Sequence, residues 1–149
     1  FLEIIKACKM IKETNFFISY PGYDLGSDEI INEIDKLSKV KDKNFFTFKN
    51  LGENSFLSLL KISDCIIGNS SSGIIEAPYV STPTINLGKR QNGRIKYTSI
   101  FDCKIESLKI EKKFKHIKSI KNKKTIFKFK KPYGSGNATE KAFKIISNV

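Results

Sequence analysis

The sequence predicts an α/β fold, namely a Rossmann-like parallel sheet with helices on both faces. Three observations support this prediction. Helix-like and strand-like segments alternate along the chain, and the connections between them are short. The 149 residues are 40% hydrophobic and 28% charged, which is typical of a globular chain and fits a single domain over residues 1–149. In such sheets, ligands bind at the carboxyl ends of the strands.

The expected helices and strands follow from hydrophobic spacing and from breaker residues. A helix is expected over residues 2–12, where one stripe carries Leu2, Ile5, Cys8 and Ile11. Further helices are expected from a cap at Ser27 to Val40, from a cap at Asn54 through Phe56, Leu57 and Leu60, over residues 74–79, and from about residue 138 to the end. Strands are expected over residues 16–20, 45–48, 65–67 and 84–87.

The segment 104–131 is rich in lysine and differs from the rest of the chain. Ile110, Phe114 and Ile117 fit the stripe of one more helix, and the alternating residues 126–131 (IFKFKK) fit an edge strand. The net charge of +12 would suit a polyanionic partner, and Phe114, Phe127 and Phe129 would be available for stacking on bases. Because these phenylalanines lie at core spacing and lysine is enriched along the whole chain, we expect no nucleic-acid partner.

Three serines and a glycine follow the third expected strand, in the stretch GNSSSGIIEAP (68–78). Ser70, Ser71, Ser72 and Gly73 would offer hydroxyls, backbone N–H groups and a helix N-terminus, a combination that binds phosphate. Gly73 would let a ligand or a neighbouring backbone approach closely. On these residues alone the alternative is equally good, namely that Asn69 or a serine only caps the following helix.

An acid and two arginines should lie near this turn, because parallel strands bring their carboxyl ends to one edge. Glu76 could accept hydrogen bonds from the paired hydroxyls of a ribose, or it could be a surface acid. Arg90 and Arg94 are the only arginines among 27 basic residues, and a planar guanidinium fork suits phosphate or carboxylate. A surface salt bridge is the alternative for either one. Together these residues suit a nucleoside diphosphate, with no metal cluster and no obvious general base.

Other features exclude several classes of protein. Cys8, Cys65 and Cys103 are too widely spaced for a disulfide framework or a zinc site, which favours reduced thiols in the cytoplasm. His116 lies among lysines and is expected at the surface. The longest apolar runs are too short for a transmembrane helix, so no membrane is expected. Residues 1–13 lack Met and indicate an amphipathic helix rather than a signal peptide, and we expect a fragment that begins inside an element.

Three stretches together resemble the C-terminal half of the UDP-N-acetylglucosamine 2-epimerase family. They are GNSSSGIIEAP (68–78), TPTINLGKRQNGR (82–94) and PYGSGNA (132–138). A fourth, YPGYDLGSDEI (20–30), is similar to the YPN-x-D-x-G-S segment of the hydrolysing branch, and the likeness runs from about Phe16 to Ile146. The resemblance implies the UDP-binding half of a two-domain, B-type glycosyltransferase-like fold, whose catalytic N-terminal half is absent here. The helix over about 138–148 would pack on that half.

The resemblance also implies roles for single residues. Ser70 and Ser71 would bind the diphosphate, with Ser72 and Gly73 completing the turn. Glu76 would bind the ribose, and Arg90 would lie beside the nucleotide. Asn50 stands at a uracil-side position that is often histidine in relatives, and Gly22 stands where the YPN segment has asparagine. Supporting positions are Asn69, Gln91 and Arg94.

The family reaction, as the resemblance implies it, eliminates UDP from UDP-N-acetylglucosamine to leave a 2-acetamidoglucal, and then adds water to give N-acetylmannosamine. It would serve sialic-acid-like or other surface-sugar biosynthesis and needs no cofactor. The acids and bases for proton transfer lie upstream in the family, so this chain alone is expected to bind UDP-sugar without catalysis. The complete enzyme is expected to be a homo-oligomer. The alternatives are the nucleotide-binding half of a B-type glycosyltransferase and a basic nucleic-acid-binding module.

Overall fold

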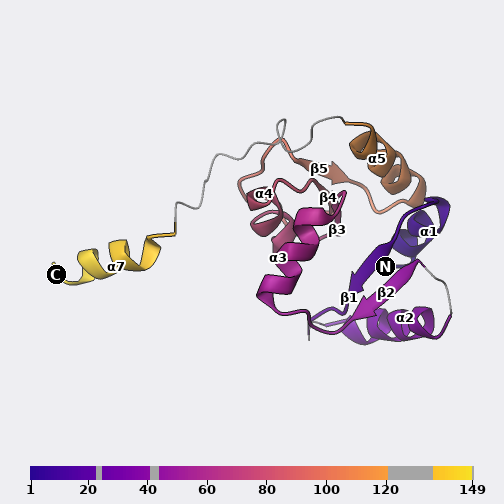
Figure 1. Ribbon diagram of the computed structural model, residues 1–149, viewed down its shortest axis with the longest axis horizontal. Helices are drawn as coiled ribbons and strands as arrows, with labels where there is room; N and C mark the ends of the chain where they lie inside the picture. Colours follow the sequence, from indigo (N-terminus) through magenta and orange to yellow (C-terminus); the bar gives the residue numbers. More distant parts are fainter. Residues whose placement is uncertain (23–24, 41–43, 121–135, 149) are drawn as a thin grey trace.

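Five parallel strands form the centre of the computed structural model, which describes residues 1–22, 25–40, 44–120 and 136–148 (Figure 1). β1 (Phe16–Ser19) pairs with β2 (Phe45–Phe48) in one sheet. The other sheet has the order β3-β4-β5, formed by β3 (Ile66–Gly68), β4 (Thr84–Leu87) and β5 (Ile100–Cys103). The predicted class of parallel strands between helices is therefore confirmed, although the strands form two sheets instead of one.

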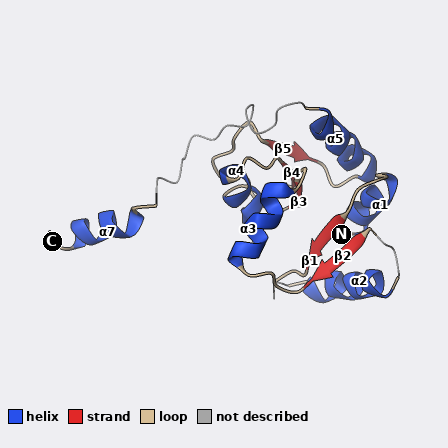
Figure 2. Cartoon of the chain, viewed as in Figure 1, coloured by secondary structure: helices blue, strands red, loops and turns tan. Residues whose placement is uncertain are grey.

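Helices cover both sides of these strands (Figure 2). These helices are α1 (Leu2–Met10), α2 (Ser27–Lys39), α3 (Glu53–Ile62), α4 (Glu76–Tyr79) and α5 (Ser107–Ser119). A further helix, α7 (Ala138–Ile146), does not lie against the strands. The helix predicted over residues 2–12 thus ends two residues earlier, and the predicted start at residue 138 is confirmed. None of the helices in these described ranges combines the length and apolar character that crossing a membrane requires.

The main hydrophobic core lies between α1, α5 and β4. Its α5 members are Ile110, Phe114 and Ile117, the three residues of the predicted stripe, and all are buried. They pack with a cluster that includes Ile85 and Leu87 of β4, and α1 contributes to it as well. Since side chains alternate across a strand, Thr84 and Asn86 of β4 point to the opposite face, where the loop after β3 lies.

The two sheets share this core but are not hydrogen-bonded to each other. Phe16 of β1 and Ile67 of β3 pack against the same cluster. The N–H groups of Phe16 and Tyr20 donate toward β2, so the alternate residues Phe17 and Ser19 turn toward the other edge. By the same alternation Ile67 turns away from β4. Within the described residues, β1 and β3 each pair with one strand only.

Two expectations about helix caps are wrong. Ser27 and Asn54 do not cap their helices, because Gly26 (φ 83°) and Gly52 (φ 70°) take the cap positions in conformations that favour glycine. The sequence also gave no indication of β5. The edge strand expected over residues 126–131 lies outside the described residues.

The three cysteines carry free thiols. Cys8 is buried in α1, and desolvation raises the pKa of its thiol to about 12. Partial burial also raises the pKa of Cys103.

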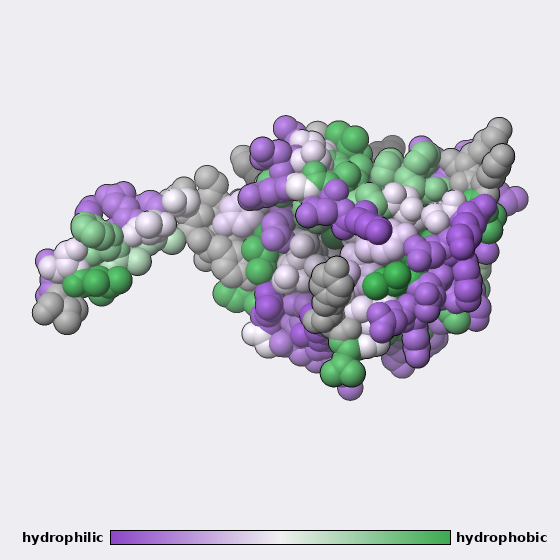
Figure 3. All heavy atoms as spheres, turned by 90° about the horizontal axis from the view of Figure 1, so that it is seen from below, coloured by the Kyte–Doolittle hydropathy of each residue, from purple (hydrophilic) through white to green (hydrophobic). Residues whose placement is uncertain are grey.

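α7 lies apart from the rest of the chain (Figure 1), and its side chains are exposed. Phe143, Ile145 and Ile146 are 70%, 68% and 73% exposed. Figure 3 shows the apolar residues of α7 on one side of the helix and hydrophilic residues on the other. The helix is therefore amphipathic, and its apolar side contacts nothing in the described structure.

Glu3 connects α1 to α5 and should make the stability depend on pH. Its carboxylate accepts hydrogen bonds from Lys6 (2.7 Å) and from the Ser107 N–H at the start of α5 (2.9 Å). These bonds, that from Lys6 first, lower the pKa of Glu3 from 4.5 to about 2. A lowered folded-state pKa contributes stability above about pH 4.5, which is lost as the pH falls toward 2.

We expect Glu3→Gln to reduce the fall in stability between pH 5 and pH 2, because glutamine has no carboxylate to protonate. Urea unfolding at several pH values, followed by circular dichroism, would measure this. Glu13→Gln, the same change at an exposed acid between α1 and β1, serves as the matched control and should change the slope less. An identical acid slope in wild type and Glu3→Gln would contradict the prediction.

Candidate functional site

The predicted site loops lie at the carboxyl ends of the parallel strands, as expected. The loop after β2, the start of α3 and the turn after β3 meet at a hollow of about 280 Å³. Residues lining the hollow are Ser19, Phe48, Lys49, Asn50, Leu51, Gly52, Glu53, Phe56 and Ser72. Asn50 and Ser72 are therefore brought together. The apolar residues Phe48, Leu51 and Phe56 were not predicted as site residues. The sequence held a signal for Phe48 alone, because it is the last residue of a predicted strand and ligands bind at strand ends.

The turn after β3 is well ordered by its own hydrogen bonds. Ser71–Gly73 forms a 3-10 turn (η1), and Ser70 precedes it. The Ser70 hydroxyl accepts from the Ser72 N–H (3.3 Å), and the Ile74 N–H donates to the Ser71 carbonyl (2.8 Å). The N–H of Ser71 has no acceptor among the described residues, so it can donate to a ligand together with the serine hydroxyls.

The predicted helix over residues 74–79 is shorter than expected. Only Glu76–Tyr79 is α-helical, with Pro78 inside it. A helix of one turn has only a small macrodipole. The expectation that the dipole of this helix helps to bind phosphate is therefore wrong. The capacity of this turn to bind an anion rests on hydroxyls and on N–H groups of the 3-10 turn.

β4 and the loop after it hold the turn at both ends. The Thr84 hydroxyl donates to the Gly73 carbonyl at 2.6 Å. The Gln91 side-chain amide donates to the Asn69 carbonyl at 2.7 Å. A Cβ atom on Gly73 would lie 2.7 Å from Cγ2 of Thr84. The close neighbour of Gly73 in this structure is thus a side chain of β4 and not a neighbouring backbone, while the close approach of a ligand stays a prediction.

Glu76 begins α4 and is half-buried. Its Oε2 atom is buried and accepts no hydrogen bond from the described residues. A carboxylate oxygen of this kind is a ready acceptor for ligand hydroxyls. The geometry is compatible with the predicted ribose contact.

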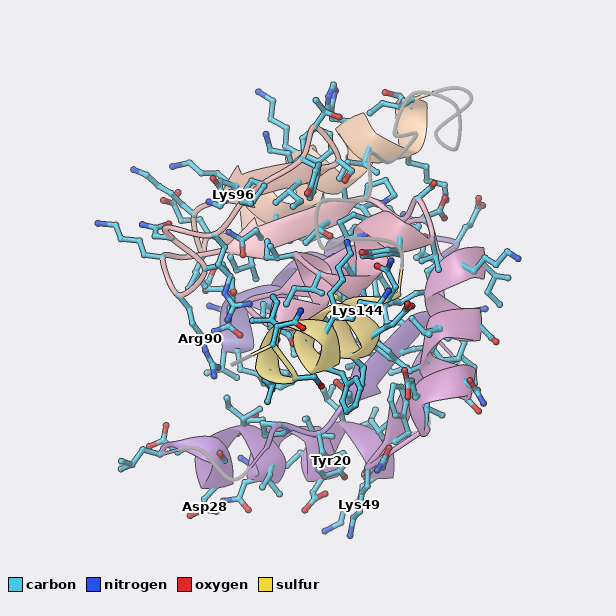
Figure 4. The ribbon with its side chains drawn as sticks, turned by 90° about the vertical axis from the view of Figure 1, so that its left-hand side faces the viewer. Tyr20, Asp28, Lys49, Arg90, Lys96 and Lys144 are labelled. Carbon is cyan, nitrogen blue, oxygen red and sulfur yellow. The ribbon has the colours of Figure 1, made fainter. Side chains whose placement is uncertain are left out.

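Three candidate site residues lie in the loop after β4, and they differ in solvent exposure. Arg90 and Arg94 are exposed, whereas Gln91 is only 3% exposed. In Figure 4, Arg90 extends away from the ribbon at the same edge of the molecule as Asp28, at the start of α2. Arg94 makes a backbone hydrogen bond to Gln91 (3.4 Å). Arg90 can therefore reach a ligand at this edge, while Gln91 is placed to support the fold of the loops.

The two remaining candidates have structural contacts of their own. The Asn50 side chain accepts from the Gly52 N–H (2.8 Å), which shapes the start of α3. The Gly22 carbonyl accepts from the Ser27 hydroxyl (2.7 Å), which explains why Ser27 is buried without capping α2. Gly22 is not among the residues that line the hollow.

The nucleic-acid alternative loses one of its stacking residues. Phe114 is 4% exposed and belongs to the core, so it cannot stack on a base. Phe127 and Phe129 lie outside the described residues. Among the residues that the structure does describe, no three metal-ligating side chains gather into a cluster.

Comparison with known proteins identifies the family. The family model described as UDP-N-acetylglucosamine 2-epimerase matches residues 1–147. The chain belongs to this family. The resemblance found in its serine turn and RQNGR loop is therefore confirmed.

Similar proteins include two named bacterial relatives. Over 82 residues, or 53% of this chain, it is 48% identical to the Campylobacter jejuni GDP/UDP-N,N'-diacetylbacillosamine 2-epimerase (hydrolyzing), of which it covers 21%. Over 147 residues, or 98% of this chain, it is 31% identical to the Escherichia coli polysialic acid biosynthesis protein P7, of which it covers 37%. The chain thus spans about a fifth to two fifths of the length of these two relatives.

A solved structure shows the same fold. It is the Methanocaldococcus jannaschii UDP-GlcNAc 2-epimerase, in complex with UDP-GlcNAc and UDP. The TM-score is 0.75 at 19% identity, over 99% of this chain and 39% of that protein. The parallel strands and their helices are therefore those of an epimerase-family fold.

Proposed function

We propose that this chain is the UDP-binding part of a hydrolysing UDP-N-acetylglucosamine 2-epimerase, which releases N-acetylmannosamine and UDP. The observation that carries the proposal is the ordered serine turn, whose Ser72 lines the hollow at the strand ends and whose Ser71 N–H has no acceptor among the described residues. Family membership and the names of the similar proteins support the reaction.

Each candidate residue then has a role. Ser70 and Ser71 would hold the diphosphate, and Arg90 would add a positive charge from the loop after β4. Glu76 would accept from the ribose hydroxyls. Asn50 and the apolar lining of the hollow would lie on the side of the base. Donors aimed at the diphosphate stabilise the negative charge that develops when UDP leaves, which is electrostatic catalysis.

We further propose that a catalytic half, together with one more strand, completes the enzyme. The open edges of β1 and β3 support this, since a parallel strand between them would give the order β2-β1-new-β3-β4-β5, the doubly wound order with its first strand in the centre. Hydrogen exchange of the Phe17 and Ile67 amides would test it. Equally fast exchange in this chain and in a form extended at its N-terminus would count against the added strand.

Other parts of the proposed function concern assembly, biosynthetic role and location. The exposed apolar side of α7 would pack on the catalytic half, and the complete enzyme would form a homo-oligomer. The E. coli relative is named as a polysialic acid biosynthesis protein, which supports a role in sialic-acid-like or other surface-sugar biosynthesis. Free thiols support a cytoplasmic location. The chain alone would bind nucleotide without turnover.

Titration of the chain with UDP in a calorimeter tests the binding role. We expect Arg90→Ala to weaken binding by at least about tenfold, since a hydrogen bond to a charged group contributes about 1.5–3 kcal/mol. Lys112→Ala removes an exposed positive charge from α5 and should leave the affinity unchanged. Equal losses in both variants, or a folded chain that binds no UDP, would contradict the proposal. Steep salt dependence with RNA binding would favour the nucleic-acid alternative.

A further inference from the structure

We propose that Gln91 is a positioning residue that sets the geometry of the serine turn from the neighbouring loop, an inference that rests on the proposed UDP site. Gln91 is 3% exposed, whereas its neighbours in the loop are all exposed. Those neighbours are Lys89, Arg90, Asn92, Gly93 and Arg94. One buried amide in an otherwise exposed loop indicates that its contacts, and not solvent, determine its position.

The contact of Gln91 controls one particular peptide group. Its Nε2 donates to the Asn69 carbonyl at 2.7 Å, across 22 residues of sequence. That carbonyl belongs to the same planar peptide unit as the Ser70 N–H, which therefore points in the opposite direction. Fixing the carbonyl fixes the N–H, and polarising the carbonyl strengthens the N–H as a donor. Gln91 thus acts on the first donor of the turn without touching the ligand.

Gln91 works together with a second anchor. The Thr84 hydroxyl holds the Gly73 carbonyl at the far end of the turn (2.6 Å). Ser70, Ser71 and Ser72 lie between the two anchored carbonyls, so both ends of the candidate phosphate-binding segment are fixed before a ligand arrives. A preformed turn loses less conformational entropy when it binds, which raises affinity without adding a contact.

The other polar atom of the Gln91 amide argues against a purely stabilising role. Gln91 Oε1 is buried and accepts no hydrogen bond from the described residues. Burying an unpaired amide oxygen is unfavourable. An apolar side chain of similar size would avoid this penalty, so glutamine here is better explained by what its N–H does to the turn than by what the whole residue adds to stability.

Gln91→Met tests the inference, because methionine fills a similar volume and cannot donate to Asn69. Amide hydrogen exchange without nucleotide should show the Ser72 and Gly73 amides exchanging about tenfold faster, the factor that one net hydrogen bond corresponds to. UDP affinity should fall by a similar factor, while Tm stays within a few degrees. Asn92→Met, the same substitution at an exposed amide of the same loop, should change none of these.

The outcomes separate this inference from the proposed function. Unchanged exchange at Ser72 and Gly73 in Gln91→Met overturns the positioning role, whether or not UDP binds. Faster exchange in a chain that binds no UDP keeps the positioning role and overturns the UDP site. Should Gln91→Met not fold, Gln91→Glu replaces the donor with an acceptor at constant shape, and the same faster exchange at the turn is expected of it.

Discussion

Replacing Ile117 with alanine is expected to lower the free energy of unfolding by about 2–5 kcal/mol, the largest effect of any substitution considered. Ile117 is fully buried in the cluster formed by α1, α5 and β4. Removing three of its side-chain carbons would leave a cavity at the place where α1, α5 and β4 pack together. Urea unfolding followed by circular dichroism would measure the loss.

Ile62→Ala provides the matched control for this prediction. It makes the same chemical change in a helix, at the end of α3, but its side chain is 82% exposed. We expect an effect within about 0.5 kcal/mol. If the two variants lost similar stability, the α1–α5 cluster would not be the core that holds the chain together.

The sequence alone was enough to predict elements whose apolar residues repeat at a regular spacing. The stripe of Ile110, Phe114 and Ile117 repeats at helical spacing, so α5 could be inferred without knowledge of its partners. β5 could not, because Asp102 lies in the middle of this four-residue strand. Its carboxylate is hydrogen-bonded by Lys96 and by Asn86, which together lower the pKa of Asp102. Neither contact is visible from the local sequence.

The candidate site also has one part that the local sequence predicts and another part that it does not. The serine turn and the RQNGR loop are local motifs, and their position at the strand ends follows from parallel pairing alone. The contacts that hold the turn are not local. Thr84 meets Gly73, and Gln91 meets Asn69, because β3 and β4 pair in the register Ile66↔Thr84. A register between strands is a property of the folded sheet, and the sequence of either strand does not specify it.

Gly73→Ala is expected to destabilise the chain by about 1–3 kcal/mol and to weaken UDP binding, because the serine turn would have to move away from β4. The added Cβ would lie 2.7 Å from Cγ2 of Thr84, closer than real Cβ contacts allow. Thr84 cannot easily yield, since it is β-branched, 2% exposed and hydrogen-bonded to the Gly73 carbonyl. Urea unfolding and UDP calorimetry would measure both effects.

A second substitution separates this clash from other costs of losing a glycine. Thr84→Ser removes Cγ2 but keeps the hydroxyl that donates to Gly73. The other neighbours of the new Cβ, Thr84 Oγ1 at 3.6 Å and Ile66 Cγ2 at 3.7 Å, are at ordinary contact distances. The double variant Gly73→Ala/Thr84→Ser should therefore be more stable than the sum of the single effects predicts, by about 0.5–3 kcal/mol. Strictly additive losses would mean that the turn rejects alanine for another reason. A restored stability with restored UDP affinity would show that the distance between β4 and the serine turn sets the geometry of the site.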